Sequence, residues 1–171
     1  MNRTDIKNIN DDWIKFSFVR NPWARLVSTY MNKASADSDS SKMTRGDYQR
    51  FLDAGIPIDK HMTFEEFCEI VCGIPDSRTE KHLRSQCSVL MHNGTAIVSY
   101  IGKVENMEDD WKNLMELAGL NARILHMNET RHEHYSSYFT DSYLINLVGD
   151  RYANDIKYFD YDFEKDSRQY R

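Results

Sequence analysis

The sequence predicts a helix-rich α/β fold, with a parallel sheet flanked by helices, in one domain of 171 residues. Two strand-like segments support this class. Apolar and polar side chains alternate over residues 13–19, and apolar side chains dominate residues 96–104. Each segment precedes one whose apolar residues recur at helical spacing, 23–33 and 107–117. Strands that alternate with helices favour parallel pairing, so we expect ligands beyond the carboxyl ends of the strands.

Local signals place the starts of the helices. Asn21 is a good N-cap and Pro22 suits the first helical position, so the first helix should begin directly after the first strand. Thr63 opens a capping-box sequence for a further helix. Asn106 and Thr140 are the N-caps expected for the helix after the second strand and for the last helix.

The remaining segments have weaker patterns. A short helix is expected within residues 47–54, and a short third strand at residues 122–125. Residues 35–46 are small and polar, which predicts a flexible loop inside the single domain 1–171. The aromatic segment 159–163 is expected to pack back against the rest of the domain.

Composition excludes several classes of protein. The 22 Lys and Arg residues are outnumbered by 27 Asp and Glu residues, and the net charge of −5 argues against a nucleic-acid partner. A small anionic ligand stays possible, because it needs only a local cluster of cations. No apolar run is long enough for a transmembrane segment, and the first residues carry no signal peptide.

The cysteine content bears on the cellular compartment. Cys68, Cys72 and Cys87 are odd in number and sparse, so we expect buried free thiols and no disulfide framework. Together with the absent signal peptide, this chain by itself predicts a cytoplasmic protein.

The segment RNPWARLVSTY at residues 20–30 is the strongest candidate for a binding site. Arg20 stands where a strand ends and a helix begins, so its guanidinium and the free N–H groups of the first helical turn could converge on one anion. Arg25 and Ser28 are three residues apart and share a helix face. A guanidinium with a hydroxyl suits a phosphate monoester. The competing interpretation is a helix with surface arginines and a hydrogen-bonded serine.

Five segments in the same order resemble one family. FSFVRNPWARLVSTY, at residues 16–30, is similar to the 3′-phosphate-binding motif of the Golgi-type carbohydrate sulfotransferases, which include chondroitin and dermatan sulfotransferases. The other similar segments are MTFEEFCEIV at 62–71, EKHLRSQ at 80–86, YIGKVENMEDD at 100–110, and HMNET at 126–130 with YFTDSYLINLVGDRYANDIKYFDYDF at 138–163. From the first segment to the last, the resemblance extends over about nine-tenths of the chain, which is why it outweighs any single motif.

This resemblance implies a P-loop-like sulfotransferase fold and a sulfate donor, 3′-phosphoadenosine 5′-phosphosulfate (PAPS), with a carbohydrate acceptor and no metal. Arg20 and Ser28 match the family positions that hold the 3′-phosphate of the nucleotide. Asn21 and Arg25 lie inside the same motif, where they either bind the nucleotide or only shape the motif. Asn128 and Thr130 match a segment expected to close over the nucleotide, the alternative being an ordinary polar loop.

For catalysis, His82 is the candidate base, because it matches the family's His in EKHLRSQ; the alternative is a structural histidine. Arg84 either binds an anionic sugar or is a solvated surface charge. Glu105 follows the second strand, where it is either catalytic or orients a neighbouring cation. His132 and His134 are too few to indicate a metal site.

The chain also departs from the family pattern. Members begin with a strand and a loop that binds the 5′-phosphosulfate, and no such loop precedes Trp13, so we expect an N-terminally truncated form of the fold. This departure keeps an alternative function open: a degenerate, non-catalytic module that retains the 3′-phosphate half-site and binds a nucleotide or a glycan. The resemblance implies a Golgi membrane protein, against the cytoplasmic prediction from the chain itself, and the sequence leaves the oligomeric state open.

Overall fold

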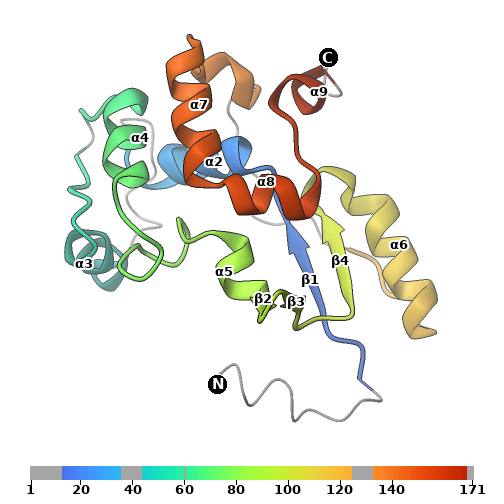
Figure 1. The fold of residues 1–171 in the computed structure, drawn as a ribbon. Coiled ribbons are helices and arrows are strands. Elements are labelled where there is room, and N and C mark those ends of the chain that lie inside the picture. Colours follow the sequence, from blue (N-terminus) through green and yellow to red (C-terminus); the bar gives the residue numbers. More distant parts are fainter. Residues whose placement is uncertain (1–12, 36–43, 60, 125–132, 169–171) are drawn as a thin grey trace. The chain divides into compact units, whose positions relative to one another are not determined.

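The computed structural model describes residues 13–35, 44–59, 61–124 and 133–168 (Figure 1). These residues form two compact units. The first unit comprises the described parts of 1–20 and 86–128, and the second comprises the described parts of 21–85 and 129–171. The first carries a small parallel sheet and the second is made of helices. The helix-rich α/β class predicted from the sequence is therefore confirmed.

The first unit is built on two parallel strands, which lie side by side in Figure 1. Strand β1 (Phe16–Val19) pairs with β4 (Tyr100–Lys103), with Phe16 opposite Tyr100 and Val19 opposite Lys103. The unit also contains α5 (Gln86–Leu90), the short strands β2 (Met91–His92) and β3 (Thr95–Ala96), the 3₁₀ turn η2 (Val104–Asn106) and helix α6 (Met107–Ala118).

An aromatic cluster packs α6 against the sheet. The ring of Trp111 on α6 lies 6.5 Å from Phe16 and 6.3 Å from Phe18. Opposite this cluster stands Gly102, where a β-carbon would come 2.5 Å from the Phe18 ring. Only glycine fits there, so the position allows the Phe18 ring to lie directly on β4.

The second unit consists of helices packed around α2. Its elements are α2 (Pro22–Lys33), α3 (Arg45–Asp53), α4 (Phe64–Cys72), the 3₁₀ turn η3 (Tyr135–Tyr138), α7 (Ser142–Arg151), α8 (Ala153–Phe159) and α9 (Phe163–Arg168). Helix α2 contacts α4, α7 and η3. The apolar face of α2 carries Leu26 and Val27, which are both fully buried. Phe67 of α4 and Val148 of α7 are fully buried as well.

Several expectations from the sequence are confirmed. Asn21 is the N-cap of α2 and Pro22 is its first residue. Thr63 forms a complete capping box with Glu66 at the start of α4. The aromatic segment 159–163 packs inward, and the ring of its last residue, Phe163, lies 5.4 Å from Trp23.

Other boundaries differ from the prediction. The strands are shorter, because only residues 16–19 and 100–103 pair with each other. Residues 122–124 form no strand; the carbonyl of Ala122 instead accepts a hydrogen bond of 2.7 Å from the Trp111 indole. Residue 125 lies outside the described residues.

Two helix starts also differ, and a third helix starts where predicted but without the expected capping bond. The short helix begins at Arg45, inside the predicted loop, because Thr44 and Asp47 form a capping box. For the last predicted helix the N-cap is Asp141 and not Thr140, because the Asp141 carboxylate accepts a hydrogen bond from the Leu144 amide. Asn106 makes no side-chain capping bond, because a 3₁₀ turn leads directly into α6.

All three cysteines are free thiols, as predicted. Cys68 and Cys87 are buried, whereas Cys72 is only partly so. Burial raises the pKa of Cys72 to about 12 and also raises the pKa of Cys68. Both groups are therefore protonated and unreactive at neutral pH, which fits a role in packing.

Candidate functional site

Arg20 directly follows β1, and the side chain of Gln86 holds its backbone. The Arg20 N–H donates to Gln86 Oε1 at 2.8 Å, and Gln86 Nε2 donates to the Arg20 carbonyl at 2.8 Å. Gln86 is the first residue of α5 and the last of the EKHLRSQ segment. Two of the five family-like segments therefore meet at this pair of hydrogen bonds.

Asn21 is fully buried, and its side chain serves the helix. The Asn21 Oδ1 accepts from the amides of Trp23 at 3.0 Å and Ala24 at 3.2 Å, and its Nδ2 donates to Asp166 at 3.0 Å. The Arg25 amide is bonded to the Asn21 carbonyl. The expectation of free N–H groups at the start of this helix is therefore wrong, because the cap uses them itself. Any anion here must be bound by side chains.

Arg25 is also engaged within the second unit. Its Nη2 donates to the Arg84 carbonyl at 2.7 Å and lies 4.0 Å from the buried carboxylate of Asp155. The guanidinium lies over the ring of Tyr152, 5.2 Å from the ring centre. Ser28 lies one turn further along α2 and is half-buried. Arg25 thus links α2 to the EKHLRSQ segment, which favours the alternative that it shapes the motif.

His82 is paired with the carboxylate of Glu80. The Glu80 Oε2 accepts from the His82 backbone N–H at 2.6 Å and lies 2.8 Å from His82 Nδ1. Glu80 is almost fully buried, with 2% of its side chain exposed, whereas 43% of the His82 side chain is exposed. A carboxylate accepts hydrogen bonds, so this contact suits the tautomer with the proton on Nδ1 and leaves Nε2 as the acceptor. A base oriented by a buried carboxylate is a geometry typical of proton abstraction.

The segment around His82 is anchored at both ends. Asp76 accepts from the backbone N–H of Ser85 at 2.9 Å, from the Ser85 hydroxyl, and from Arg151 Nη2 at 2.7 Å. The Tyr152 hydroxyl donates to the Leu83 carbonyl at 2.8 Å. Burial alone would raise the pKa of Asp76, but the bonds from Ser85 and Arg151 outweigh it and lower the pKa. These hydrogen bonds hold the backbone of the segment that carries His82 and Glu80.

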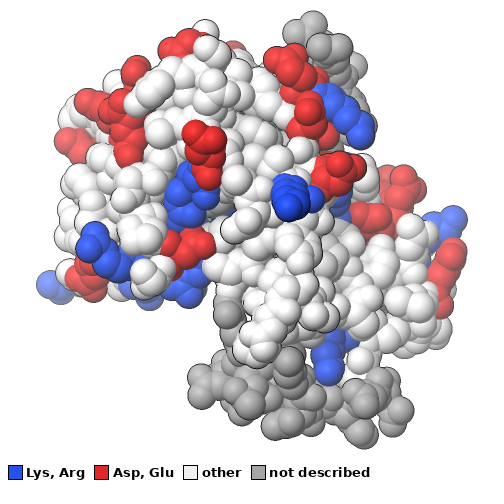
Figure 2. Space-filling view, in the orientation of Figure 1, with Lys and Arg blue, Asp and Glu red and all other residues white. Residues whose placement is uncertain are grey.

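A cavity of about 290 Å³ lies next to this pair. Four cationic side chains line it together with two carboxylates; the lining residues are Arg50, Asp53, Ala54, Arg78, Thr79, Glu80, Lys81 and Arg84. Figure 2 shows Lys and Arg side chains gathered around α3, with acidic side chains among them. The buried hydroxyl of Thr79 has no hydrogen-bond partner among the described residues. The surplus of cations suits a ligand with an anionic group.

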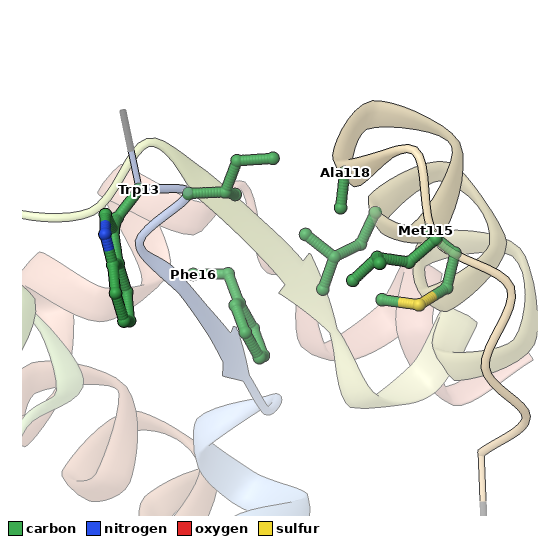
Figure 3. A pocket seen from close by; sticks show the side chains of 7 residues that line it. Trp13, Phe16, Met115 and Ala118 are labelled. Atoms are coloured by element: carbon green, nitrogen blue, oxygen red, sulfur yellow. The ribbon is translucent and has the colours of Figure 1, made fainter. Parts of the chain in front are cut away.

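A second cavity, of about 320 Å³, lies in the first unit. Phe16 extends toward it from β1, and Met115 and Ala118 from α6 (Figure 3). The other lining residues are Trp13, Ile14, Leu114 and Leu120, and none of the seven is charged. An apolar lining provides no partner for a phosphate or sulfate, so this cavity is no candidate for the nucleotide phosphates.

The sequence also singles out five further residues. Asn128, Thr130 and His132 lie outside the described residues. His134 caps η3, with its Nδ1 2.9 Å from the Ser136 hydroxyl. Glu105 lies in η2 and is half-buried.

Neither a metal site nor a membrane-spanning helix is found in the described part of the chain. In it, no group of three or more His, Cys, Asp or Glu side chains is arranged to hold a metal ion. None of its helices combines the length and the apolar character needed to cross a membrane.

Glu80 and Gln86 are the residues that sequence reasoning missed. Both flank His82 within the EKHLRSQ segment, so a signal was available in the spacing of an acid two residues before a histidine. The partner of Gln86 lies 66 residues away, and no local pattern reveals such a contact.

Comparison with known proteins supports the family resemblance of the sequence segments described above. Residues 1–162 match the model of the sulfotransferase family. The proteins named carbohydrate sulfotransferase 11 of Mus musculus and Rattus norvegicus are each 29% identical to the chain over 133 residues. These alignments cover 70% of this chain, and the chain spans 38% of the length of either relative. No solved structure matches the chain. Because the family model covers nearly the whole sequence, the chain belongs to the sulfotransferase family.

Proposed function

We propose that the protein transfers a sulfuryl group from PAPS to a hydroxyl of a carbohydrate. The observation that carries the proposal is the family match over residues 1–162, which includes the RNPWARLVSTY motif and the His82–Glu80 pair. The two relatives are named as carbohydrate sulfotransferases, which supports a carbohydrate acceptor.

On the nucleotide side, Arg20 and Ser28 bind the 3′-phosphate. A guanidinium donates two parallel hydrogen bonds to a phosphate, and a hydroxyl adds a third donor. Asn21 and Arg25 act on the motif instead, since Asn21 caps α2 and Arg25 bonds to the Arg84 carbonyl. Asn128 and Thr130 belong to the segment that closes over the nucleotide.

On the acceptor side, His82 is the general base. Nε2 takes the proton of the acceptor hydroxyl while the hydroxyl oxygen forms a bond to sulfur. The bond from sulfur to the phosphate oxygen breaks, and the electron pair leaves with 3′-phosphoadenosine 5′-phosphate. Glu80 holds Nδ1–H and stabilises the imidazolium that forms, a task that its buried carboxylate suits.

The cationic cavity beside this pair is the proposed acceptor region. Arg84 and Lys81 belong to the EKHLRSQ segment and line the cavity with Arg78 and Arg50. Arg84 there serves an anionic group of the sugar, while its backbone carbonyl holds Arg25. A Golgi location stays a prediction from the family resemblance.

The test is transfer of sulfur-labelled sulfate from PAPS to a panel of glycans. We expect label in at least one glycan, and its loss in Arg20→Ala and in His82→Ala. Arg123→Ala, an exposed arginine outside the motifs, is the matched control and should retain activity. Binding of 3′-phosphoadenosine 5′-phosphate with no labelled glycan would support the non-catalytic module in its place.

A further inference from the structure

We propose that Gln86 is a positioning residue for nucleotide binding, because its carboxamide fixes the direction in which the Arg20 side chain leaves the backbone. The inference rests on the proposed function, in which Arg20 binds the 3′-phosphate. Nothing in the sequence of the EKHLRSQ segment suggests this task, because Gln86 and Arg20 are 66 residues apart.

The geometry of the contact is reciprocal. Gln86 accepts from the Arg20 N–H through Oε1 and donates to the Arg20 carbonyl through Nε2, both at 2.8 Å. The N–H belongs to the peptide plane before the Arg20 Cα, and the carbonyl belongs to the plane after it. Holding both planes fixes φ and ψ at this residue, and hence the direction of the Cα–Cβ bond.

The pairing of β1 with β4 does not fix the peptide planes of Arg20. The register between β1 and β4 ends with Val19 opposite Lys103. Arg20 therefore lies one residue beyond the parallel ladder, where its peptide groups need another partner. The Gln86 carboxamide supplies a donor and an acceptor at the spacing that a neighbouring peptide would offer. It also lies at the first position of α5, so the clamp is carried by a helical turn.

A fixed backbone matters more for Arg20 than for most residues. A guanidinium binds phosphate through two parallel bonds, which requires the correct plane and approach. Ordering the backbone in advance removes an entropy cost of binding that would otherwise reduce affinity. Loss of the clamp should therefore weaken the contact to the 3′-phosphate and leave contacts to the rest of the nucleotide unchanged.

The experiment compares two nucleotides by calorimetry, 3′-phosphoadenosine 5′-phosphate and adenosine 5′-phosphate, which lacks the 3′-phosphate. Gln86→Met removes both hydrogen bonds at nearly unchanged side-chain length. We expect its affinity for the first nucleotide to fall roughly 3- to 10-fold, the loss that about one net hydrogen bond produces. Its affinity for the second should stay unchanged. Gln49→Met, on the exposed face of α3, is the control and should change neither affinity.

A double variant separates positioning from a general structural role. In an Arg20→Ala background, Gln86→Met should cause no further loss of affinity for 3′-phosphoadenosine 5′-phosphate. If Gln86→Met does not fold, Gln86→Glu replaces it, because its carboxylate keeps the bond from the Arg20 N–H and loses the bond to the carbonyl. For either variant, an equal loss with both nucleotides, or additive losses with Arg20→Ala, overturns the inference.

The two proposals fail in different ways. If Arg20→Ala binds 3′-phosphoadenosine 5′-phosphate as the unchanged protein does, the nucleotide site itself is wrong and the role of Gln86 falls with it. If Arg20→Ala loses affinity while Gln86→Met binds both nucleotides normally, the nucleotide site stands and only the positioning role is refuted.

Discussion

At the scale of single residues, the His82–Glu80 pair carries the proposed chemistry. One carboxylate oxygen of Glu80 receives both the backbone and the ring N–H of His82. The backbone bond fixes the residue, and the ring bond favours one tautomer, which leaves Nε2 as the nitrogen proposed to meet the acceptor. A surface histidine without this carboxylate would rotate and exchange tautomers freely.

Replacing either member of the pair should affect turnover and not nucleotide binding. We expect His82→Ala to lower kcat roughly 10²- to 10⁴-fold, the usual contribution of a general base. Glu80→Gln should lower kcat by a smaller factor, because the base remains but its tautomer is no longer fixed. Steady-state kinetics with PAPS and a glycan measure both effects.

The control is His61→Ala, an exposed histidine in the same unit, which should retain full activity. Unchanged kcat in His82→Ala would remove the histidine from the mechanism. An equal loss of nucleotide affinity would mean that its role is to maintain the fold.

At the scale of elements, local chemistry sets most boundaries. Asn21 with Pro22, and Thr63 with Glu66, were readable from the sequence because a cap and the amides that it serves lie within three residues of each other. The prediction of a strand at 122–125 was wrong for the described residues 122–124. A strand also needs a partner strand, and an apolar pattern does not reveal one.

The cap of α2 allows a direct test of stability. Asn21→Ala removes the buried acceptor of two helix amides and the part-buried bond to Asp166. We expect a loss of about 1–2 kcal/mol in the free energy of unfolding, measured by urea denaturation. Asn113→Ala, on the exposed face of α6, should change stability little. A loss confined to nucleotide affinity, with stability unchanged, would contradict the capping role.

The contact between β4 and Phe18 allows another test. In Gly102→Ala the new methyl group would come 2.5 Å from the Phe18 ring, so the ring must move. We expect a loss of roughly 1–3 kcal/mol in the free energy of unfolding, as overpacking usually costs. Gly46→Ala is the control, because a β-carbon there meets nothing closer than 3.7 Å. Equal stability of the two variants would contradict this packing.

At the scale of the whole molecule, distant segments are tied by side chains to backbone groups. Arg151 reaches Asp76 across 75 residues, and Tyr152 reaches Leu83 across 69. The sequence predicted the fold class and the order of the motifs. It could not predict these links or the Gln86 clamp, because long-range contacts leave no periodic pattern along the chain. The candidate base was found through the resemblance, whereas its carboxylate partner needed the structure.

The Asp76 contacts predict how stability depends on pH. The pKa of Asp76 lies below its ordinary value of 3.8, so its bonds to Ser85 and Arg151 contribute fully above about pH 4. Their contribution is lost as the pH falls through the lower pKa of the folded state. Asp47 acts in the same direction, because hydrogen bonds from Thr44 lower its pKa to about 2.

In Asp76→Asn we therefore expect lower stability at pH 7 and a shallower fall between pH 5 and pH 2. Thermal unfolding of both proteins over this range measures the difference. Parallel pH profiles, with the variant as stable as the parent at pH 7, would show that these contacts do not contribute.

The central claim is that this chain recognises the 3′-phosphate of a nucleotide through Arg20. The most direct measurement is the ratio of its affinities for 3′-phosphoadenosine 5′-phosphate and adenosine 5′-phosphate, before and after Arg20→Ala. We predict a preference for the first nucleotide that falls by about 1.5–3 kcal/mol in the variant, the size of a charge-assisted hydrogen bond. Equal affinity for both nucleotides in the unchanged protein, or a preference that survives the loss of Arg20, would contradict the account.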